Sequence, residues 1–109
     1  MIDLGIWLPI FGGWLRNVDD EGMPPTFDYN KQVAQAADRH GFSTILIAEL
    51  NLNDIKGIAA PSLECWTTTA GLAPVTENIR LMAALRPGFR SPAVAAKMAA
   101  NIDHMADGR

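Results

Sequence analysis

Apolar residues are grouped in three short runs along the chain, separated by segments of mixed polarity. Residues 4–10 (LGIWLPI) and 44–48 (TILIA) are almost wholly apolar, which is typical of strands covered on both faces. A third run of the same kind spans residues 79–85. The pattern therefore predicts three strands, and Trp7, which alternates with the other apolar residues of the first run, is expected in the core.

Three further segments place apolar residues at helical spacing and carry helix start and stop signals. They span residues 28–40, 62–74 and 91–108. Asp28 and Ser91 are predicted as N-caps, and a proline follows Ser91 at the first helical position. Strand and helix thus alternate three times, which predicts a parallel sheet with right-handed crossovers.

The connections that leave the predicted strands are longer than those that enter them. Residues 11–27 and 49–61 form two long loops, and residues 86–90 form a short third one. In parallel α/β folds the carboxyl ends of the strands carry the site, and long loops inside compact domains are usually functional. Any chemistry is therefore expected on these three connections. Within the first loop, the acidic residues 19–21 are interpreted as a solvated face.

Three strand–helix units can begin either a doubly wound sheet or a (β/α)8 barrel, and the pattern alone does not choose between them. In both folds three parallel strands leave two open edges, each a row of unpaired backbone groups. The last predicted helix runs to Asp107-Gly108-Arg109 with no fourth strand behind it. We therefore expect the 109 residues to be one portion of a larger fold.

Composition and charge narrow the function classes. The net charge is −3, from 9 basic and 12 acidic residues without an extended run of like charge, which argues against nucleic-acid and anionic-membrane surfaces and favours small-molecule partners. The single cysteine, Cys65, cannot form an internal disulfide, and no signal peptide or membrane-spanning run is visible. A cytoplasmic protein is therefore expected. One cysteine and two distant histidines offer no metal-ligand spacing.

Five stretches of the sequence carry a resemblance to a known family: GIWLPI, GGW, AADRHGF, LAPVTENIRLMAALRP and SPAVAAKMAANIDHMADGR. Together they resemble the N-terminal part of the bacterial luciferase-like flavin monooxygenases, most closely the dimethyl sulfone and alkanesulfonate monooxygenases and more distantly the pyrimidine monooxygenases. The resemblance implies a (β/α)8 TIM barrel. Residues 1–109 would be its first three βα units, the N-terminal portion of a single barrel domain without a second domain, and inactive alone.

The resemblance further implies a two-component, FMNH2-dependent monooxygenase. A separate NAD(P)H-dependent flavin reductase would supply reduced FMN, which would react with O2 to oxygenate a small organosulfur compound and break its C–S bond. Dimethyl sulfone, converted to methanesulfinate, is the first expected substrate, and an alkanesulfonate is the second. A homo-oligomer without nucleic-acid or membrane partners is expected.

Cofactor-binding residues are expected at the ends of the second and third strands. Related enzymes contact the flavin at the positions of Ala48, Glu49 and Leu50, although Glu49 could instead be a solvated residue at the start of a loop. At Ala84 and Leu85 the family places an unusual cis peptide bond under the flavin ring. The resemblance places most phosphate ligands and the catalytic acid or base beyond the last residue, so no catalytic residue is assigned.

Substrate-binding residues are expected on the three connections. Trp14 could wall an apolar pocket that keeps water away from the flavin, or it could cover the barrel mouth or an interface. Phe11 is a second pocket candidate, and Arg86 could meet a sulfonyl oxygen or pair with an acidic loop residue. Ser62 stands where the sulfonate enzymes carry a cysteine. Cys65 therefore does not inherit that role and is expected to be a small buried hydrophobe.

Three other interpretations stay open. A deazaflavin-dependent oxidoreductase would use the same barrel for hydride transfer. A non-catalytic fragment could self-assemble through its open edges or complement a partner chain. An independent doubly wound nucleotide-binding domain would have to complete its own sheet.

Overall fold

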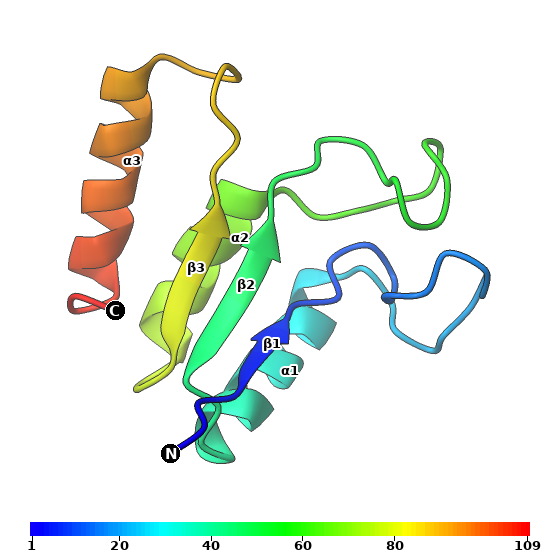
Figure 1. Cartoon of the computed structure of the whole chain (residues 1–109), viewed down its shortest axis with the longest axis horizontal. Coiled ribbons are helices and arrows are strands. Elements are labelled where there is room, and N and C mark those ends of the chain that lie inside the picture. Colours follow the sequence, from blue (N-terminus) through cyan, green and yellow to red (C-terminus); the bar gives the residue numbers. More distant parts are fainter.

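The fold is built on a parallel sheet of three strands, β1 (Gly5–Trp7), β2 (Thr44–Ala48) and β3 (Arg80–Ala84). The computed structural model describes every residue from 1 to 109. The strands lie in the order β1-β2-β3, and both neighbouring pairs are parallel (Figure 1). The predicted parallel sheet and its alternation with helices are confirmed. The arrangement is consistent with part of a (β/α)8 barrel.

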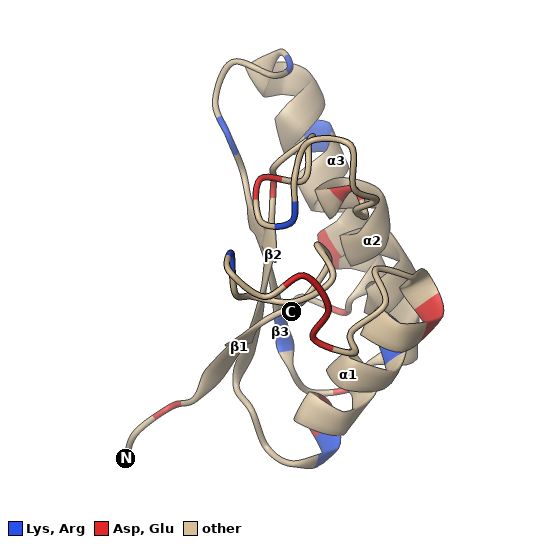
Figure 2. Cartoon of the chain, turned by 90° about the vertical axis from the view of Figure 1, so that its right-hand side faces the viewer, with Lys and Arg blue, Asp and Glu red and all other residues tan.

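Helices α1 (Phe27–Arg39), α2 (Cys65–Leu72) and α3 (Pro92–Met105) each follow a strand, and a short 3-10 helix, η1 (Ala73–Val75), extends α2. The three α-helices lie on the same side of the sheet, and no helix lies on the other side (Figure 2). One face of the sheet is therefore packed and the other is open.

The N-terminus of α1 differs from the prediction. Thr26 is the N-cap, and its hydroxyl accepts a hydrogen bond from the Tyr29 N–H at 3.3 Å. Asp28 lies in the first turn, where its carboxylate pairs with Lys31 at 3.1 Å. The predicted cap was therefore wrong by two residues, because both threonine and aspartate suit a helix start and an acidic residue in the first turn also favours the helix dipole.

Helix α2 begins later than predicted, whereas α3 begins as predicted. Glu64 is the N-cap of α2, and its carboxylate accepts two backbone N–H groups of the first turn, so Ser62 lies outside the helix. Just before this cap, the Leu63 N–H donates to the Ile10 carbonyl at 3.0 Å and so ties the segment to the first connection. In α3 the Ser91 hydroxyl caps the first turn, and a proline follows it.

The core lies between the sheet and the helices. Ile45 and Ile47 of β2 are fully buried in one apolar cluster with Ala34 of α1 and Leu72 of α2. Burying an aliphatic side chain of the size of isoleucine contributes about 1.5–3 kcal/mol relative to leaving it exposed, so this cluster holds the helices on their side of the sheet.

The open face of the sheet is also apolar. Leu46 of β2 is the register partner of Trp7 in β1 and of Met82 in β3, and register partners point to the same face. Trp7 is 44% exposed and Met82 is 53% exposed, because no helix covers them. The prediction that Trp7 lies in the core is therefore wrong here. In a closed barrel, side chains on such a face fill the interior.

Polar groups fix the amino end and the outer edge of β3. The Asp38 carboxylate of α1 accepts hydrogen bonds from the N–H groups of residues 77–79 at 2.6–3.3 Å. Burial raises the pKa of Asp38, but these backbone donors outweigh it and the pKa is lowered. At the outer edge of β3, the Arg109 carbonyl accepts the Leu81 N–H at 2.9 Å.

Candidate functional site

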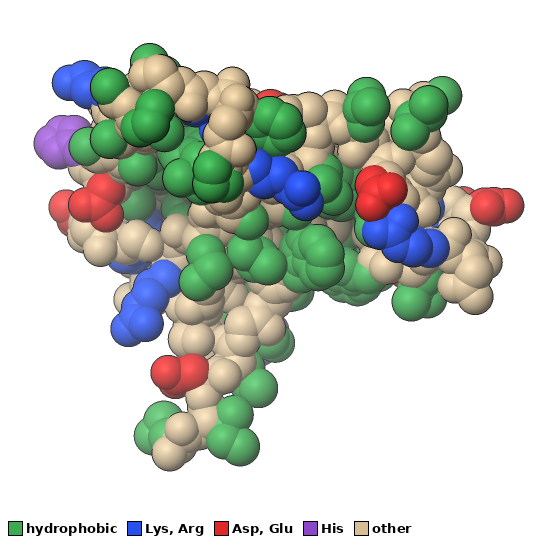
Figure 3. Space-filling view, turned by 45° about the horizontal axis from the view of Figure 1, so that its top comes forward, with side chains coloured by type: hydrophobic (Ala, Val, Ile, Leu, Met, Phe, Trp, Pro, Cys, Tyr) green, Lys and Arg blue, Asp and Glu red, His purple; other side chains and the backbone are tan.

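Three connections leave the carboxyl ends of the strands and gather at one end of the sheet (Figure 1). They span residues 8–26, 49–64 and 85–91. Apolar side chains cover much of the face that Figure 3 shows, and basic side chains lie between them. The connections that were expected to carry the site therefore do lie at one end of the molecule.

The first connection folds Trp14 back toward its own strand. The Trp14 indole N–H donates a hydrogen bond to the Trp7 carbonyl at 2.8 Å, and the residue is 39% exposed. Phe11 is almost completely buried and lines a cavity of about 420 Å³ between the first and second connections. The structure thus places one aromatic ring at the surface of this end and the other beneath it.

Asn53 ties the first and second connections together. Its side-chain amide donates to the Phe11 carbonyl at 2.9 Å and to the Pro61 carbonyl at 2.8 Å. Its side-chain oxygen accepts the N–H groups of Ile55 and Lys56. Because Asn53 is buried and both ends of its amide are bonded, it fixes the relative position of two loops that are about 40 residues apart in the chain.

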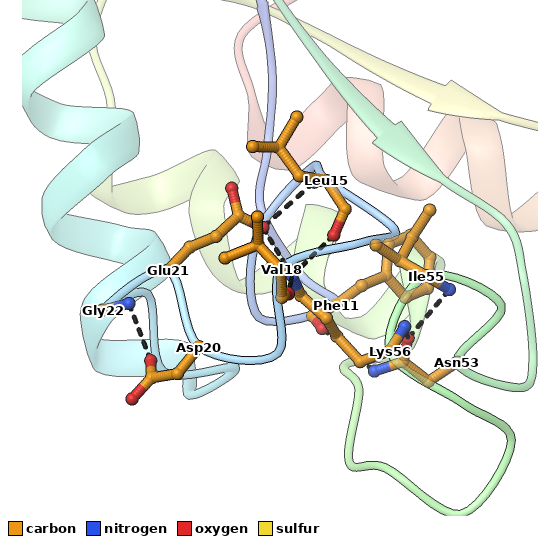
Figure 4. A network of polar contacts seen from close by, with 9 residues as sticks. All are labelled: Phe11, Leu15, Val18, Asp20, Glu21, Gly22, Asn53, Ile55 and Lys56. Atoms are coloured by element: carbon orange, nitrogen blue, oxygen red, sulfur yellow. Dashed lines mark hydrogen bonds and ion pairs between the residues drawn. The ribbon is translucent and has the colours of Figure 1, made fainter.

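Lys56 and Glu21 form a second, charged link between the same loops (Figure 4). The Lys56 ammonium lies 2.6 Å from the Glu21 carboxylate and also donates to the carbonyls of Leu15, at 2.7 Å, and Val18. The two side chains are only 8% and 9% exposed. The hydrogen bond from Lys56 is the largest cause that lowers the pKa of Glu21. The interpretation of residues 19–21 as a solvated face is therefore wrong at Glu21.

Glu49, at the end of β2, is a fully buried carboxylate. It accepts the Trp66 indole N–H at 2.8 Å and the Arg86 backbone N–H at 2.7 Å, and it forms an ion pair with Arg90. The Arg90 guanidinium carbon lies 5.2 Å from the centre of the Trp66 ring. The alternative of a solvated Glu49 is wrong, because these contacts join β2, α2 and the third connection. Sequence reasoning missed Arg90, since no local spacing links residues that are so far apart in the chain.

The buried carboxylate makes the fold sensitive to acid. The hydrogen bond from Arg90 is the largest cause that holds the pKa of Glu49 below its ordinary value, in spite of burial. A carboxylate whose pKa is lower in the folded state contributes stability above its unfolded pKa, about 4.3, and loses it as the pH falls through the folded pKa. We expect the free energy of unfolding to fall more steeply below about pH 4 in the parent chain than in Glu49→Gln. Urea unfolding at several pH values measures this, and parallel curves would contradict it.

Ser62 and Leu50 are brought together by the second connection. They line a small cavity of about 70 Å³ with Asn51, Leu63 and Glu64. Arg86, on the third connection, is exposed, and its backbone rather than its side chain is bound to Glu49.

The ends of β2 and β3 carry small side chains. Ala48 and Ala84 are register partners, and Leu85 beyond them is exposed. All peptide bonds are trans, so the cis bond expected at Ala84–Leu85 is not present in this structure. A larger, mostly apolar groove of about 570 Å³ runs along β3 and α3, with Leu81 and other apolar residues in its lining.

Cys65 behaves as the sequence predicts. It is 2% exposed, and its thiol donates to the Ile47 carbonyl at 3.1 Å. Burial is the largest cause that raises the pKa of this thiol to about 11, so it remains protonated at neutral pH. Cys65 is therefore a packing residue.

Two further features of the chain concern metals and membranes. No group of three or more histidine, cysteine, aspartate or glutamate side chains is arranged to hold a metal ion. None of the helices combines the length and the apolar character that crossing a bilayer requires.

Comparison of the sequence with known proteins finds one matching family and several relatives. Residues 2–109 match the family described as luciferase-like monooxygenase. The chain is 36% identical over 115 residues to the pyrimidine monooxygenase RutA of Bradyrhizobium sp. and to that of Pseudomonas savastanoi pv. phaseolicola, with 99% of the chain and 31% of each relative covered. It is 38% identical over 116 residues to the protein of the same name from Allorhizobium ampelinum, covering 100% of the chain and 30% of that relative. The chain thus spans less than a third of the length of these relatives.

Proposed function

Because the chain belongs to the luciferase-like monooxygenase family, we propose that residues 1–109 form the N-terminal portion of one barrel domain whose carboxyl end binds reduced FMN. A separate NAD(P)H-dependent reductase supplies the reduced flavin, and O2 is the second substrate. The match over residues 2–109 is the observation that carries this proposal. The reaction takes place in the cytoplasm.

The residues at this end of the sheet fit a planar and largely apolar ring. Ala48, which is 7% exposed, and Ala84 carry small side chains where β2 and β3 end, and Leu50 and Leu85 are apolar residues that follow these two strands. These four residues would hold the flavin. Glu49 would take part through its backbone, because protein donors already occupy its carboxylate. When bound, reduced flavin supplies the electrons that activate O2.

Trp14 and Phe11 would exclude water from this end of the sheet. Trp14 is partly exposed beside the end of β1, and Phe11 forms apolar support beneath the same connection. Removing water from such a site strengthens the electrostatic interactions inside it and suppresses side reactions. Aromatic side chains can exclude water in this way without contacting the reacting atoms.

We propose a small organosulfur compound as substrate, dimethyl sulfone first and an alkanesulfonate second. The exposed Arg86 guanidinium forms no ion pair with the protein, and a guanidinium can donate two parallel hydrogen bonds to sulfonyl oxygens. The Ser62 hydroxyl, in the small cavity beside Leu50, is a further polar group for the substrate. Oxygenation would break the C–S bond.

A second candidate substrate is a pyrimidine. The matched relatives carry the name pyrimidine monooxygenase, which favours this ring as an alternative to an organosulfur compound. The Arg86 guanidinium could equally donate to ring carbonyl oxygens.

Anaerobic titration of the chain with reduced FMN, followed by tryptophan fluorescence, tests the proposal. We expect saturable quenching with reduced FMN and weaker quenching with a reduced deazaflavin. Adding dimethyl sulfone, methanesulfonate or uracil to the saturated chain should shift the signal for the true substrate class. No binding of reduced FMN, or a preference for the deazaflavin, would contradict it.

Turnover by this chain alone is expected to be absent. The resemblance places most phosphate ligands and the catalytic acid or base outside residues 1–109. Purified chain supplied with a flavin reductase, NADH, FMN, O2 and dimethyl sulfone should yield no sulfinate above the background without the chain, as measured by mass spectrometry. Measurable turnover would show that residues 1–109 contain the missing groups.

A further inference from the structure

The two long connections are joined by a lysine that has almost no contact with solvent. The Lys56 side chain is 8% exposed, and its ammonium has three acceptors: Glu21 and the carbonyls of Leu15 and Val18. An ammonium has three N–H donors, so all of them are used. Lysine is rarely buried unless it is paired, and the first connection supplies every one of these partners. The first connection therefore surrounds the ammonium group of Lys56, a residue of the second connection.

The Glu21 carboxylate holds the backbone on both sides of Trp14. The same oxygen that contacts Lys56 accepts the Leu15 N–H at 3.0 Å. On the other side of Trp14, a Cβ placed on Gly13 would lie 1.9 Å from this oxygen, so the carboxylate packs directly against the Gly13 backbone. Lys56 therefore acts on the segment that carries the indole, with Glu21 as the intermediate.

Trp14 itself has few other attachments. Its indole makes one hydrogen bond, to the Trp7 carbonyl, and the residue is partly exposed. The position of an exposed ring on a long loop depends on how its backbone is fixed, because each free torsion adds conformational entropy. The Glu21 carboxylate, held by Lys56, contacts the backbone of the residues directly before and after Trp14.

We propose that Lys56 and Glu21 are positioning residues. They hold the first connection against the second and thereby fix the position of Trp14 at the carboxyl end of the sheet. The consequence for ligand binding rests on the proposed function. The positioning itself does not, because it concerns only residues of this chain.

The structure provides a matched control. Arg16 and Asp54 form an ion pair between the same two connections at 2.7 Å, but their side chains are 62% and 60% exposed. Exposed pairs of this kind contribute little, because water and salt screen them. Arg16→Gln therefore removes a charge and a link from the same loops without opening a buried site.

The test labels the three tryptophans with 5-fluorotryptophan and records fluorine NMR spectra of the full chain, with the Trp14 signal assigned by Trp14→Phe. In Glu21→Gln and Lys56→Met, the Trp14 signal should move and broaden, and its solvent accessibility should rise. The signal of Trp66, which is bonded to Glu49 on another element, should stay in place. Arg16→Gln should leave all three signals unchanged.

The outcomes separate this inference from the proposed function. If Lys56→Met does not fold, the near-isosteric Glu21→Gln still decides the question. An unmoved Trp14 signal in folded Glu21→Gln, or an equal shift in Arg16→Gln, would overturn the positioning role.

The affinity for reduced FMN gives a second measurement. Where the parent chain binds reduced FMN, we expect the dissociation constant to rise about tenfold in Glu21→Gln and to change less than about twofold in Arg16→Gln, since only Glu21→Gln loses the pre-organised position of Trp14. Equal affinities of the parent chain and Glu21→Gln for reduced FMN would overturn only the expected effect on ligand binding. A parent chain without FMN affinity would refute the proposed function and leave the Trp14 spectra as the decisive result.

Discussion

Replacing Glu49 by glutamine should lower the free energy of unfolding by about 3 kcal/mol, because removing one partner of a buried ion pair leaves the other charge uncompensated. Glu49 is fully buried, and its carboxylate holds Trp66, Arg90 and the Arg86 backbone. Glutamine keeps the shape of the side chain, so the loss reports on charge and hydrogen bonding rather than on a cavity. Urea unfolding followed by circular dichroism at neutral pH measures it.

Glu77→Gln is the control for this substitution. Glu77 is exposed and forms no ion pair, so the same chemical change should alter the free energy of unfolding by less than about 0.5 kcal/mol. A loss below about 1 kcal/mol in Glu49→Gln would mean that the Arg90 pair does not hold the third connection to the sheet.

Replacing Gly13 by alanine should cost about 3 kcal/mol of stability, from backbone strain and a steric clash together. Gly13 has a φ of 135°, which side chains rarely adopt, and a Cβ there would lie 1.9 Å from the Glu21 carboxylate. The carboxylate cannot swing away freely, because Lys56 and the Leu15 N–H hold it. Thermal or urea unfolding gives the magnitude.

Gly57→Ala separates the two causes. Gly57 also has a positive φ, 115°, but an added Cβ would have no heavy atom within 4 Å. Strain alone should cost about 1 kcal/mol at this position. Equal losses at Gly13 and Gly57 would show that the contact with Glu21 plays no part.

The fold was predictable because the hydrophobic pattern and the helix-start signals of the sequence indicate the same elements. The β-branched run 44–48 gave a central strand at those residues, and Ser91 with its following proline gave the start of α3. Helix starts failed where two good caps lie close together, as with Thr26 and Asp28. The prediction that Trp7 lies in the core was wrong for another reason. Alternation identifies the two faces of a strand, but it does not say which face a helix covers.

The position of the three connections was predictable from the sequence, but the bonds within and between them were not. The long connections located the carboxyl end, and Trp14 and Arg86 do lie there with exposed side chains. The Lys56–Glu21 and Glu49–Arg90 pairs join residues more than 30 positions apart, and no spacing rule connects them. Glu21, interpreted as solvated, and Glu49, for which solvation was the alternative, both have buried carboxylates, because burial of a charge depends on a partner that only the fold supplies.

We propose that reduced flavin binds where β2 and β3 end, between the first and third connections. Nitrogen-15 NMR of the labelled chain, titrated anaerobically with reduced FMN, tests it most directly. We expect the amide signals of residues 48–50 and 84–86 to shift first, together with those of residues 11–14. Shifts confined to residues 77–79 at the opposite end of the sheet, or to the outer surfaces of the helices, would contradict it.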